Sequence, residues 1–566
     1  MIRPRLRRAA ALLAVGAAAG GLLVACGGDD RSDVDYLVDA RVSSYNVNTV
    51  DGHADGALMA LSRVLPGFNI VGPDGQIIAD RDIGTVTPQP GGGLTLRYDF
   101  NPAAVYSDGT KLTCDDLFLA ATAMSGTTPG FAAATNAGYR DIASVDCRPG
   151  ESSATVAFAK GREYGQWNEL FGAGTLLPAH VVARLAGVPN VVDPIRSGDK
   201  AAIAKIVKAW NTAFDMLPGA AIDEKTFVSA GPYRVESYSV DGGLKLIEND
   251  KWWGARPTSD TITVWPRGTD GDTALDGSKA TVIDTADLAL GDRVSGRASA
   301  TTPVDRSTLR ETAPLSVTQL VFEGRGVAAD PLVRKALASC MPRDSLARRY
   351  GANGIVWNLR TASPSDPLGP SLNVQYGRRY PRSDVPRAKD LLSQRAVSDT
   401  GRRAKPTVRI GYLAKSPENA DVVKMISDAC TPAGFTIEDV SSPELSVNSL
   451  GTDVDALLLS DGSFAASSTA SGFPEAFALY GGDPLNLSKF RNAQVSEAIT
   501  ALAATRSDSA RLPLLRTIET VAWDELPTIP LYGTVRARES SLVTHVVPGL
   551  GVSGTGWNMD RWGVSG

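Results

Sequence analysis

The sequence predicts an α/β protein built from more than one lobe. The chain has 566 residues, 43% of them hydrophobic and 21% charged, and single hydrophobic cores stop growing at roughly 300 residues. Its later part alternates as strand, helix, strand and strand over "PTVRIGYL" (406–413), 419–431, "FTIEDV" (435–440) and "DALLLS" (455–460). This order is typical of a βαβ unit with a buried parallel sheet.

The earlier part of the chain predicts antiparallel strands and amphipathic helices. "LTLRYDF" (94–100) and "ESSATVAFA" (151–159) alternate apolar and polar residues, which indicates strands with one buried face. A helix is expected to begin after Thr113, because a threonine before two aspartates suits a helix start. Residues 201–216 have the period of an amphipathic helix, and two strands flank the turn Asp241-Gly242 as a hairpin.

The N-terminus is typical of a secretory signal that covers residues 1–25. Four arginines precede a short apolar run, and small residues precede Cys26. An uncleaved membrane anchor is the alternative, since the run is just long enough to span a bilayer. Loss of residues 1–25 removes four arginines and no acid, so the net charge falls from −5 to −9. An acidic chain without basic runs argues against nucleic acid as a partner.

The export prediction divides the five cysteines into two groups. Cys114, Cys147, Cys340 and Cys430 can form disulfides in an oxidising compartment, with three possible pairings. We expect the pairing local in sequence, 114–147 and 340–430, and buried free thiols are the alternative. Cys26 is then the odd cysteine.

Catalytic and metal-binding patterns are weak, so we expect neither an enzyme nor a metal or other cofactor. The three histidines, His53, His180 and His545, lie far apart without the spacing of metal ligands. Ser197-x-x-Lys200 matches a serine-acylation motif, but no K-T-G strand follows it. Gly549-x-Gly551-x-x-Gly554 lies too near the C-terminus for a dinucleotide fold and is interpreted as a loop.

Five further segments carry a resemblance to a known family. In order they are "AVYSDGTKLTCDDLFLA" (104–120), "SAGPYRVESYSVDGGLKLIENDKWWG" (229–254), "DPLVRKALASCMPRDSLARRY" (330–350), "PRAKDLLSQRA" (386–396) and "DELPTIPLY" (524–532). Each resembles a segment of the bacterial extracellular solute-binding proteins, family 5, of the peptide and nickel ABC importers. The resemblance covers about residues 36–566. We expect Trp252 and Trp253 to pack a lobe, and Arg334 and Arg343 to lie on the polar side of a helix.

The resemblance implies a bilobed fold of the periplasmic-binding-protein type (type II), with two α/β lobes and a hinge. Lobe I would comprise residues 36–265 plus 520–566, and lobe II residues 266–519. Such a protein closes on a small solute like a clamp and docks on a permease. The expected partners are a peptide-like solute and ABC permease subunits, and the expected state is a monomer.

The residues around Cys26 resemble a bacterial lipobox, Leu23-Val24-Ala25-Cys26. In such a protein the signal is cleaved before the cysteine, which is acylated. Several acyl chains on one residue anchor a protein stably in a bilayer. Residues 26–35 would then be the lipidated cysteine and a flexible tether, and the protein would lie on the outer face of the cytoplasmic membrane.

The ligand anchor of peptide-binding relatives is altered in this chain. In those relatives an aspartate after the strand like "DALLLS" pairs with the ligand's α-amino group. Here Asp461 comes too early in the loop, and Phe464 lies at the expected place. Either Asp461 substitutes from a shifted register, or the ligand is not a free peptide, because a buried ammonium without an acid costs several kcal/mol.

Four other residues are ligand-binding candidates. Lys415 could hold a ligand anion, although a solvated loop lysine is the simpler interpretation. Tyr45, Asn46 and Trp357 are candidates by position only. The leading hypothesis is a solute-binding lipoprotein of an ABC importer. The alternative is a lipoprotein of the same fold that acts as an interaction or regulatory protein in cell-envelope assembly.

Overall fold

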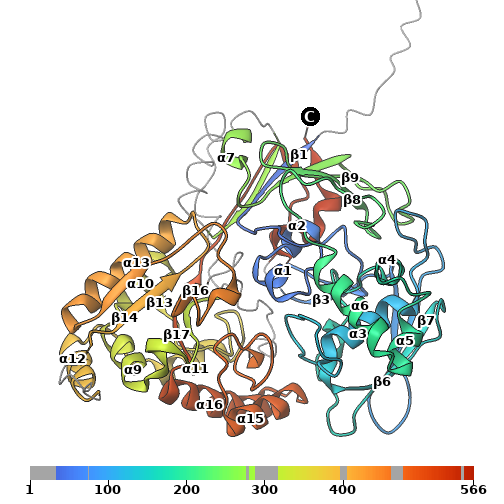
Figure 1. Cartoon of the computed structure of the whole chain (residues 1–566). Coiled ribbons are helices and arrows are strands. Elements are labelled where there is room, and N and C mark those ends of the chain that lie inside the picture. The colour runs from blue at the N-terminus through green and yellow to red at the C-terminus, as the bar shows by residue number, and fades with distance from the viewer. Residues whose placement is uncertain are drawn as a thin grey trace, which may run out of the picture.

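Two six-stranded sheets organise the chain, one in each of two lobes (Figure 1). The computed structural model describes residues 33–73, 75–275, 280–286, 316–395, 404–459, 476–505, 507–549 and 553–565. In sheet order, the strands of lobe I are β18 (Ala537–Ser541), β11 (Thr281–Thr285), β1 (Val34–Val38), β10 (Thr261–Trp265), β9 (Gly243–Glu248) and β8 (Tyr233–Ser239). Strand β1 pairs in parallel with β10 and with β11, and the predicted hairpin is β8–β9.

A second, four-stranded sheet extends lobe I. Its strands are β4 (Gly84–Pro88), β5 (Thr95–Phe100), β7 (Ser153–Phe158) and β6 (Ile142–Asp146), and the longer helices beside it are α3 (Cys114–Ser125), α4 (Ala179–Ala186), α5 (Val192–Ser197) and α6 (Lys200–Thr212). The predicted alternation is confirmed in β5, where Leu96, Tyr98 and Phe100 are buried. The predicted start of α3 is also confirmed, because the Asp116 carboxylate accepts from the Thr113 N–H at 3.0 Å. Short elements complete the lobe: α1 (Val50–Ala54), α2 (Leu58–Leu61), β2 (Asn69–Val71), β3 (Ile77–Ala79), α7 (Gly271–Ala274), β19 (Val543–Thr544) and β20 (Gly563–Val564).

Lobe II holds the predicted βαβ unit inside a mixed sheet. The strands, in sheet order, are β13 (Gly351–Val356), β17 (Thr528–Thr534), β12 (Val317–Phe322), β16 (Ala456–Leu459), β14 (Thr407–Gly411) and β15 (Thr436–Asp439). Strand β14 is parallel to β15 and β16, as predicted, whereas β12 pairs antiparallel with β16 and β17. Around the sheet lie α9 (Pro331–Cys340), α10 (Arg343–Tyr350), α11 (Gly369–Tyr376), α12 (Val385–Ser393), α13 (Pro417–Cys430), α15 (Ala493–Ala503) and α16 (Asp508–Glu525).

The chain crosses between the lobe sheets later than the predicted boundaries at 265/266 and 519/520. Strand β11 still belongs to the sheet of lobe I, and β12, the next described strand along the chain, belongs to the sheet of lobe II. Helix α16 and strand β17 still belong to lobe II, so the return crossing lies between Thr534 and Ala537. The reason is that pairing between strands distant in sequence decides which sheet a strand joins. Strand β11 pairs with β1, and strand β17 pairs with β12.

Both disulfides of the pairing local in sequence are present. Cys114 at the start of α3 pairs with Cys147 just after β6. Cys340 at the end of α9 pairs with Cys430 at the end of α13. Each bridge therefore joins two elements within one lobe.

A buried ion-pair cluster lies where the chain returns to lobe I. The Arg536 guanidinium contacts Asp284 of β11 at 2.7 Å and Asp39, just after β1, at 2.8 Å. Asp284 also accepts from the Thr555 N–H at 2.7 Å. Burial by itself raises the pKa of Asp284, but Arg536 and Arg538 hold that pKa below its usual range. The cluster thus joins the ends of three segments beside the crossing between the lobes.

Arg343 is buried, which corrects its predicted place on the polar side of a helix. The guanidinium donates to the backbone oxygens of Pro530, Arg379, Tyr380 and Trp357. These acceptors satisfy its N–H groups without a carboxylate, and burial lowers the pKa of Arg343 to about 9. Arg343 therefore holds segments of lobe II together.

The tryptophan pair after β9 packs lobe I, as predicted. The Trp252 and Trp253 ring centres lie 4.5 Å apart. The Trp253 Nε1–H donates to the Asp82 backbone oxygen at 2.7 Å, and the Trp252 Nε1–H donates to that of Ala255 at 3.0 Å.

Candidate ligand site between the lobes

The two lobes touch near the hinge through backbone oxygens of lobe II. The Arg267 guanidinium of lobe I donates to the Lys415 backbone oxygen at 2.7 Å. The Arg41 guanidinium donates to the Pro443 backbone oxygen at 3.1 Å and is also paired with Asp55 of its own lobe at 2.9 Å.

Helix α1 supplies the next contact along the junction. The Asp51 carboxylate of α1 accepts from the Ser446 hydroxyl and, at 3.1 Å, from the Asn448 amide, both in lobe II. Thr49 caps this short helix, because its hydroxyl oxygen accepts from the Gly52 N–H at 3.1 Å. The cap fixes the turn that points Asp51 at lobe II.

The junction is also closed away from the hinge. The Asn136 N–H of lobe I donates to the Asp483 carboxylate of lobe II at 3.1 Å, and the Arg140 guanidinium lies 4.2 Å from the centre of the Tyr480 ring. Burial raises the pKa of Asp483 to about 7, although hydrogen bonds from Leu485 and Asn136 favour its charged form. Contacts on both sides therefore enclose the middle of the junction.

A small cavity lies between the lobes in this enclosed region. Its volume is about 20 Å³, which is room for about one water molecule. It is lined by Val50, His53, Ala54 and Ala134 of lobe I and by Val447, Pro484, Leu485 and Leu487 of lobe II. The lining is apolar except for His53.

His53, which lines this cavity, carries an unsatisfied polar atom. Its Nε2 is buried and has no hydrogen-bond partner among the residues that the structure describes. Burial lowers the pKa of His53, so the imidazole is neutral at pH 7 and presents one donor and one acceptor nitrogen. A buried polar atom without a partner costs about 1–3 kcal/mol, and a ligand group that pairs with Nε2 would recover this cost.

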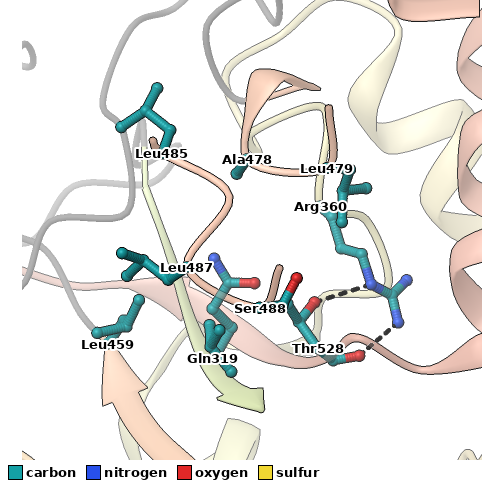
Figure 2. A pocket seen from close by; sticks show the side chains of 10 residues that line it. Gln319, Arg360, Leu459, Ala478, Leu479, Leu485, Leu487, Ser488 and Thr528 are labelled. Atoms are coloured by element: carbon teal, nitrogen blue, oxygen red, sulfur yellow. Dashed lines mark hydrogen bonds between the residues drawn. The ribbon is translucent and has the colours of Figure 1, made fainter. Parts of the chain in front are cut away.

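A second cavity of about 20 Å³ shares Leu485 and Leu487 with the first. Figure 2 shows these leucines and Leu459 on one side, and Arg360 and Thr528 on the other. The Arg360 guanidinium donates to the Thr528 hydroxyl and backbone oxygens at 2.9 and 2.7 Å, and it is paired with Glu519 at 3.1 Å. Arg360 is therefore already neutralised. Of the residues that the structure describes, no acidic side chain lines either cavity.

The sequence-predicted ligand residues do not gather at these cavities. The Tyr45 hydroxyl donates to the Val228 backbone oxygen, and the Asn46 amide donates to that of Trp210. The Trp357 Nε1–H donates to the Ala362 backbone oxygen at 2.9 Å. All three are buried within their own lobes, and a ligand role for them stays a prediction.

Lys415 lines a different cavity, of about 590 Å³, beside the end of β1 and near the hinge. Residues of both lobes line this cavity, among them Asp39 and Arg267 of lobe I and Pro443 of lobe II. A ligand role for Lys415 stays a prediction. Asp461 and Phe464 lie outside the described residues, as does Cys26.

From the sequence, His53 was assessed only as a possible metal ligand. No role was predicted for His53 in the cleft between the lobes. The available signal was its position eight residues after Tyr45, which is one of the predicted ligand-binding candidates. Its place opposite Leu485 and Leu487, however, depends on how the lobes meet.

The serine of the serine-acylation motif, Ser197, is hydrogen-bonded within its own helix. Ser197 ends α5 and is exposed, and its hydroxyl donates to the Pro194 backbone oxygen at 3.2 Å.

Among the described helices, none is both long and apolar enough to cross a bilayer.

The comparison with protein families decides what this two-lobed architecture is. The model for "Bacterial extracellular solute-binding proteins, family 5 Middle" matches residues 89–482. The chain belongs to this family. It is accordingly a solute-binding protein and not an enzyme.

Relatives agree with this assignment, and solved structures share the fold. The chain is 38% identical over 571 residues to the lipoprotein Rv2585c of Mycobacterium tuberculosis, covering 100% of this chain and 99% of the relative. It is 26% identical over 536 residues to the oligopeptide-binding protein OppA of Mycobacterium bovis, covering 90% and 81%. The fold is similar to that of the periplasmic EDTA-binding protein EppA, with a TM-score of 0.72 at 18% identity and 94% and 97% coverage. It is also similar to that of AppA from Bacillus subtilis in complex with a nonapeptide, with a TM-score of 0.70 at 13% identity and 94% and 99% coverage.

Proposed function

We propose that this family 5 protein is a membrane-anchored lipoprotein that binds a small, neutral, mainly apolar solute between its lobes and delivers it to an ABC permease. The observation that carries the ligand class is the buried Nε2 of His53, which has no partner within the described part of the chain, in a residue that lines an apolar cavity between the lobes. The solute would place its apolar part against Leu485 and Leu487 and a hydroxyl or amide group against His53.

The surroundings of the cavity argue against a ligand that carries an unpaired charge. A charged group taken out of water costs several kcal/mol unless an opposite charge meets it. No acid among the described lining residues could meet a peptide's ammonium, and the one lining cation, Arg360, is paired with Glu519. A neutral solute with one hydrogen-bonding group avoids this cost.

Entry of the solute requires the lobes to move apart, because each of the two cavities has room for about one water molecule. The contacts of Asp51 with Asn448 and of Asn136 with Asp483 join the lobes across the cleft. They would break on opening and form again once the solute is enclosed, in a hinge closure.

Membrane attachment is the second part of the proposal. We infer that Cys26 is acylated after cleavage of residues 1–25 and holds the protein on the outer face of the cytoplasmic membrane. Several acyl chains on Cys26 supply stable anchoring. A curated relative, Rv2585c, is itself named a lipoprotein.

A thermal-shift screen with two variants of His53 tests the ligand class. Neutral amides and alcohols with an apolar group should raise the Tm of the protein, whereas free peptides and organic anions should not. His53→Leu removes both ring nitrogens at similar volume and should abolish the shift, while His53→Gln keeps an amide near the Nε2 position and should retain part of it. Tm shifts with charged peptides that do not depend on His53 would contradict the neutral-ligand proposal.

The small cavities also favour the second candidate, a lipoprotein that acts through its surface in envelope assembly, because a permanently closed cleft needs no solute. In that case no solute would raise the Tm, and small-angle scattering would report one compact state under all conditions. A solute-dependent change in the radius of gyration would exclude it.

A further inference from the structure

The proposed anchor at Cys26 restricts which end of the protein can face the membrane. Strand β1 begins at Val34, eight residues after Cys26. Whatever the conformation of this tether, its reach is at most about 29 Å. The end of lobe I where β1 begins is therefore held within that distance of the lipid headgroups. This step rests on the lipid anchor of the proposed function.

The segment after β18 lies at the same end of the sheet. Asp35 of β1 is in register with Thr281 of β11, and Thr281 with Ser541 of β18. Neighbouring strands are about 4.8 Å apart, so Leu542 lies about 10 Å from the start of β1. Figure 1 shows the C-terminus at this end as well.

This segment is unusual for a water-facing surface. Residues 542–548 read "LVTHVVP" and contain no Asp, Glu, Lys or Arg. Leu542 is 53% exposed and Val547 is 38% exposed, so two large apolar side chains five residues apart face the solvent. Trp557 is half-buried and its Nε1–H donates to the Val547 backbone oxygen at 2.8 Å.

The surface continues into the C-terminal tail, where Arg561 is the single Lys or Arg of residues 549–566. Strand β19 pairs with β20, with Val543 opposite Val564. The tail contacts the loop after β9, since the Thr258 N–H donates to the Asp560 backbone oxygen at 3.0 Å. Arg561, the basic residue of this tail, is paired with Asp560 at 3.0 Å.

We propose that residues 542–548, together with Trp557, form a surface that contacts the bilayer into which Cys26 is anchored. Aliphatic side chains and a tryptophan whose N–H is satisfied suit the boundary between headgroups and acyl chains. The mature chain carries a net charge of −9 after loss of residues 1–25, so most of its surface would be repelled by anionic lipids. An uncharged segment at the tethered end can approach them without this penalty.

The protein offers a clean reporter for this contact. Four cysteines are paired in disulfides and Cys26 would be acylated, so Leu542→Cys introduces the single free thiol for a nitroxide spin label. The full-length acylated protein is measured in phosphatidylcholine vesicles, and the soluble state is supplied by the same labelled variant with Cys26→Ser. Val374→Cys is the matched control, because Val374 is 78% exposed on α11 of lobe II.

We expect accessibility of the Leu542→Cys label to chromium oxalate to fall at least threefold in vesicles, with a rise in accessibility to oxygen. The Val374→Cys label should not change, and Val547→Cys should repeat the result of Leu542→Cys. Unchanged accessibility at both 542 and 547 in acylated, vesicle-bound protein would overturn this inference and leave the anchor intact. A mass spectrum without acyl groups on Cys26 would overturn both.

Discussion

Substitution of Asp483 by asparagine should remove a pH dependence from lobe closure. Asp483 accepts from the Asn136 N–H across the junction, and burial raises its pKa to about 7. A solvated aspartate titrates at about pH 4, so the closed form binds a proton on Asp483 more tightly than an open form does. Protonation of Asp483 therefore contributes most to closure below about pH 4. This contribution is lost as the pH rises through about 7.

The size of the effect follows from the pKa difference. About three pKa units at about 1.4 kcal/mol each give at most about 4 kcal/mol between acidic and neutral pH. The figure is an upper bound because Asp483 also accepts from Leu485 in its own lobe at 3.0 Å, so part of its burial persists in the open form.

Small-angle scattering of the ligand-free protein measures this prediction through the radius of gyration. The wild-type protein should be more compact at about pH 5 than at about pH 8, whereas Asp483→Asn, which cannot ionise, should be equally compact at both. A pH-dependent radius that persists in Asp483→Asn would refute the reasoning.

Asp116 supplies the matched control for Asp483. Burial raises its pKa to about 7 as well, but its carboxylate accepts from the Ala179 N–H within lobe I. Asp116→Asn should change how the stability of the fold depends on pH and leave the pH dependence of closure as in the wild type.

Three further predictions concern stability and anchoring. Arg536→Met should lower the free energy of unfolding by about 3–5 kcal/mol in urea titration, because the buried Asp39 and Asp284 lose the Arg536 guanidinium, while Arg538 still contacts Asp284 at 3.2 Å; a loss under about 1 kcal/mol would contradict the role of the cluster. Removal of the 340–430 disulfide should lower the free energy of unfolding by about 5 kcal/mol, and removal of the 114–147 disulfide should lower it by about 4 kcal/mol. The difference arises because the closed loops span 90 and 33 residues. A larger loss for the 114–147 disulfide would contradict this explanation. Cys26→Ser should move the protein from the membrane pellet to the soluble fraction without changing its Tm, and protein that still pellets would refute the lipid anchor.

Patterns within a short stretch of chain predicted much of the fold. The alternating segments at 406–440 became β14 and β15 around α13, because a βαβ unit needs only neighbours in sequence. The hairpin at Asp241-Gly242 formed for the same reason. Both disulfides followed the shortest available pairing.

Features that depend on distant segments could not be predicted in the same way. Strand β1 pairs with β10 and β11, more than two hundred residues later, and this pairing moved the lobe boundary. Arg343 appeared to lie on a polar helix face, but its hydrogen-bond acceptors come from segments around residues 357, 379 and 530. The role of His53 likewise needs lobe II opposite it.

Native mass spectrometry of the gently purified, full-length acylated protein tests the central claim most directly. A solute-binding protein with an enclosed cleft should carry a small non-covalent adduct, which is released on denaturation and identified as a neutral compound with a hydroxyl or amide group. The same preparation of His53→Leu should show the bare acylated mass. A wild-type protein that shows only the bare acylated mass, and gains no adduct from extracts of the cells that make it, would contradict the account.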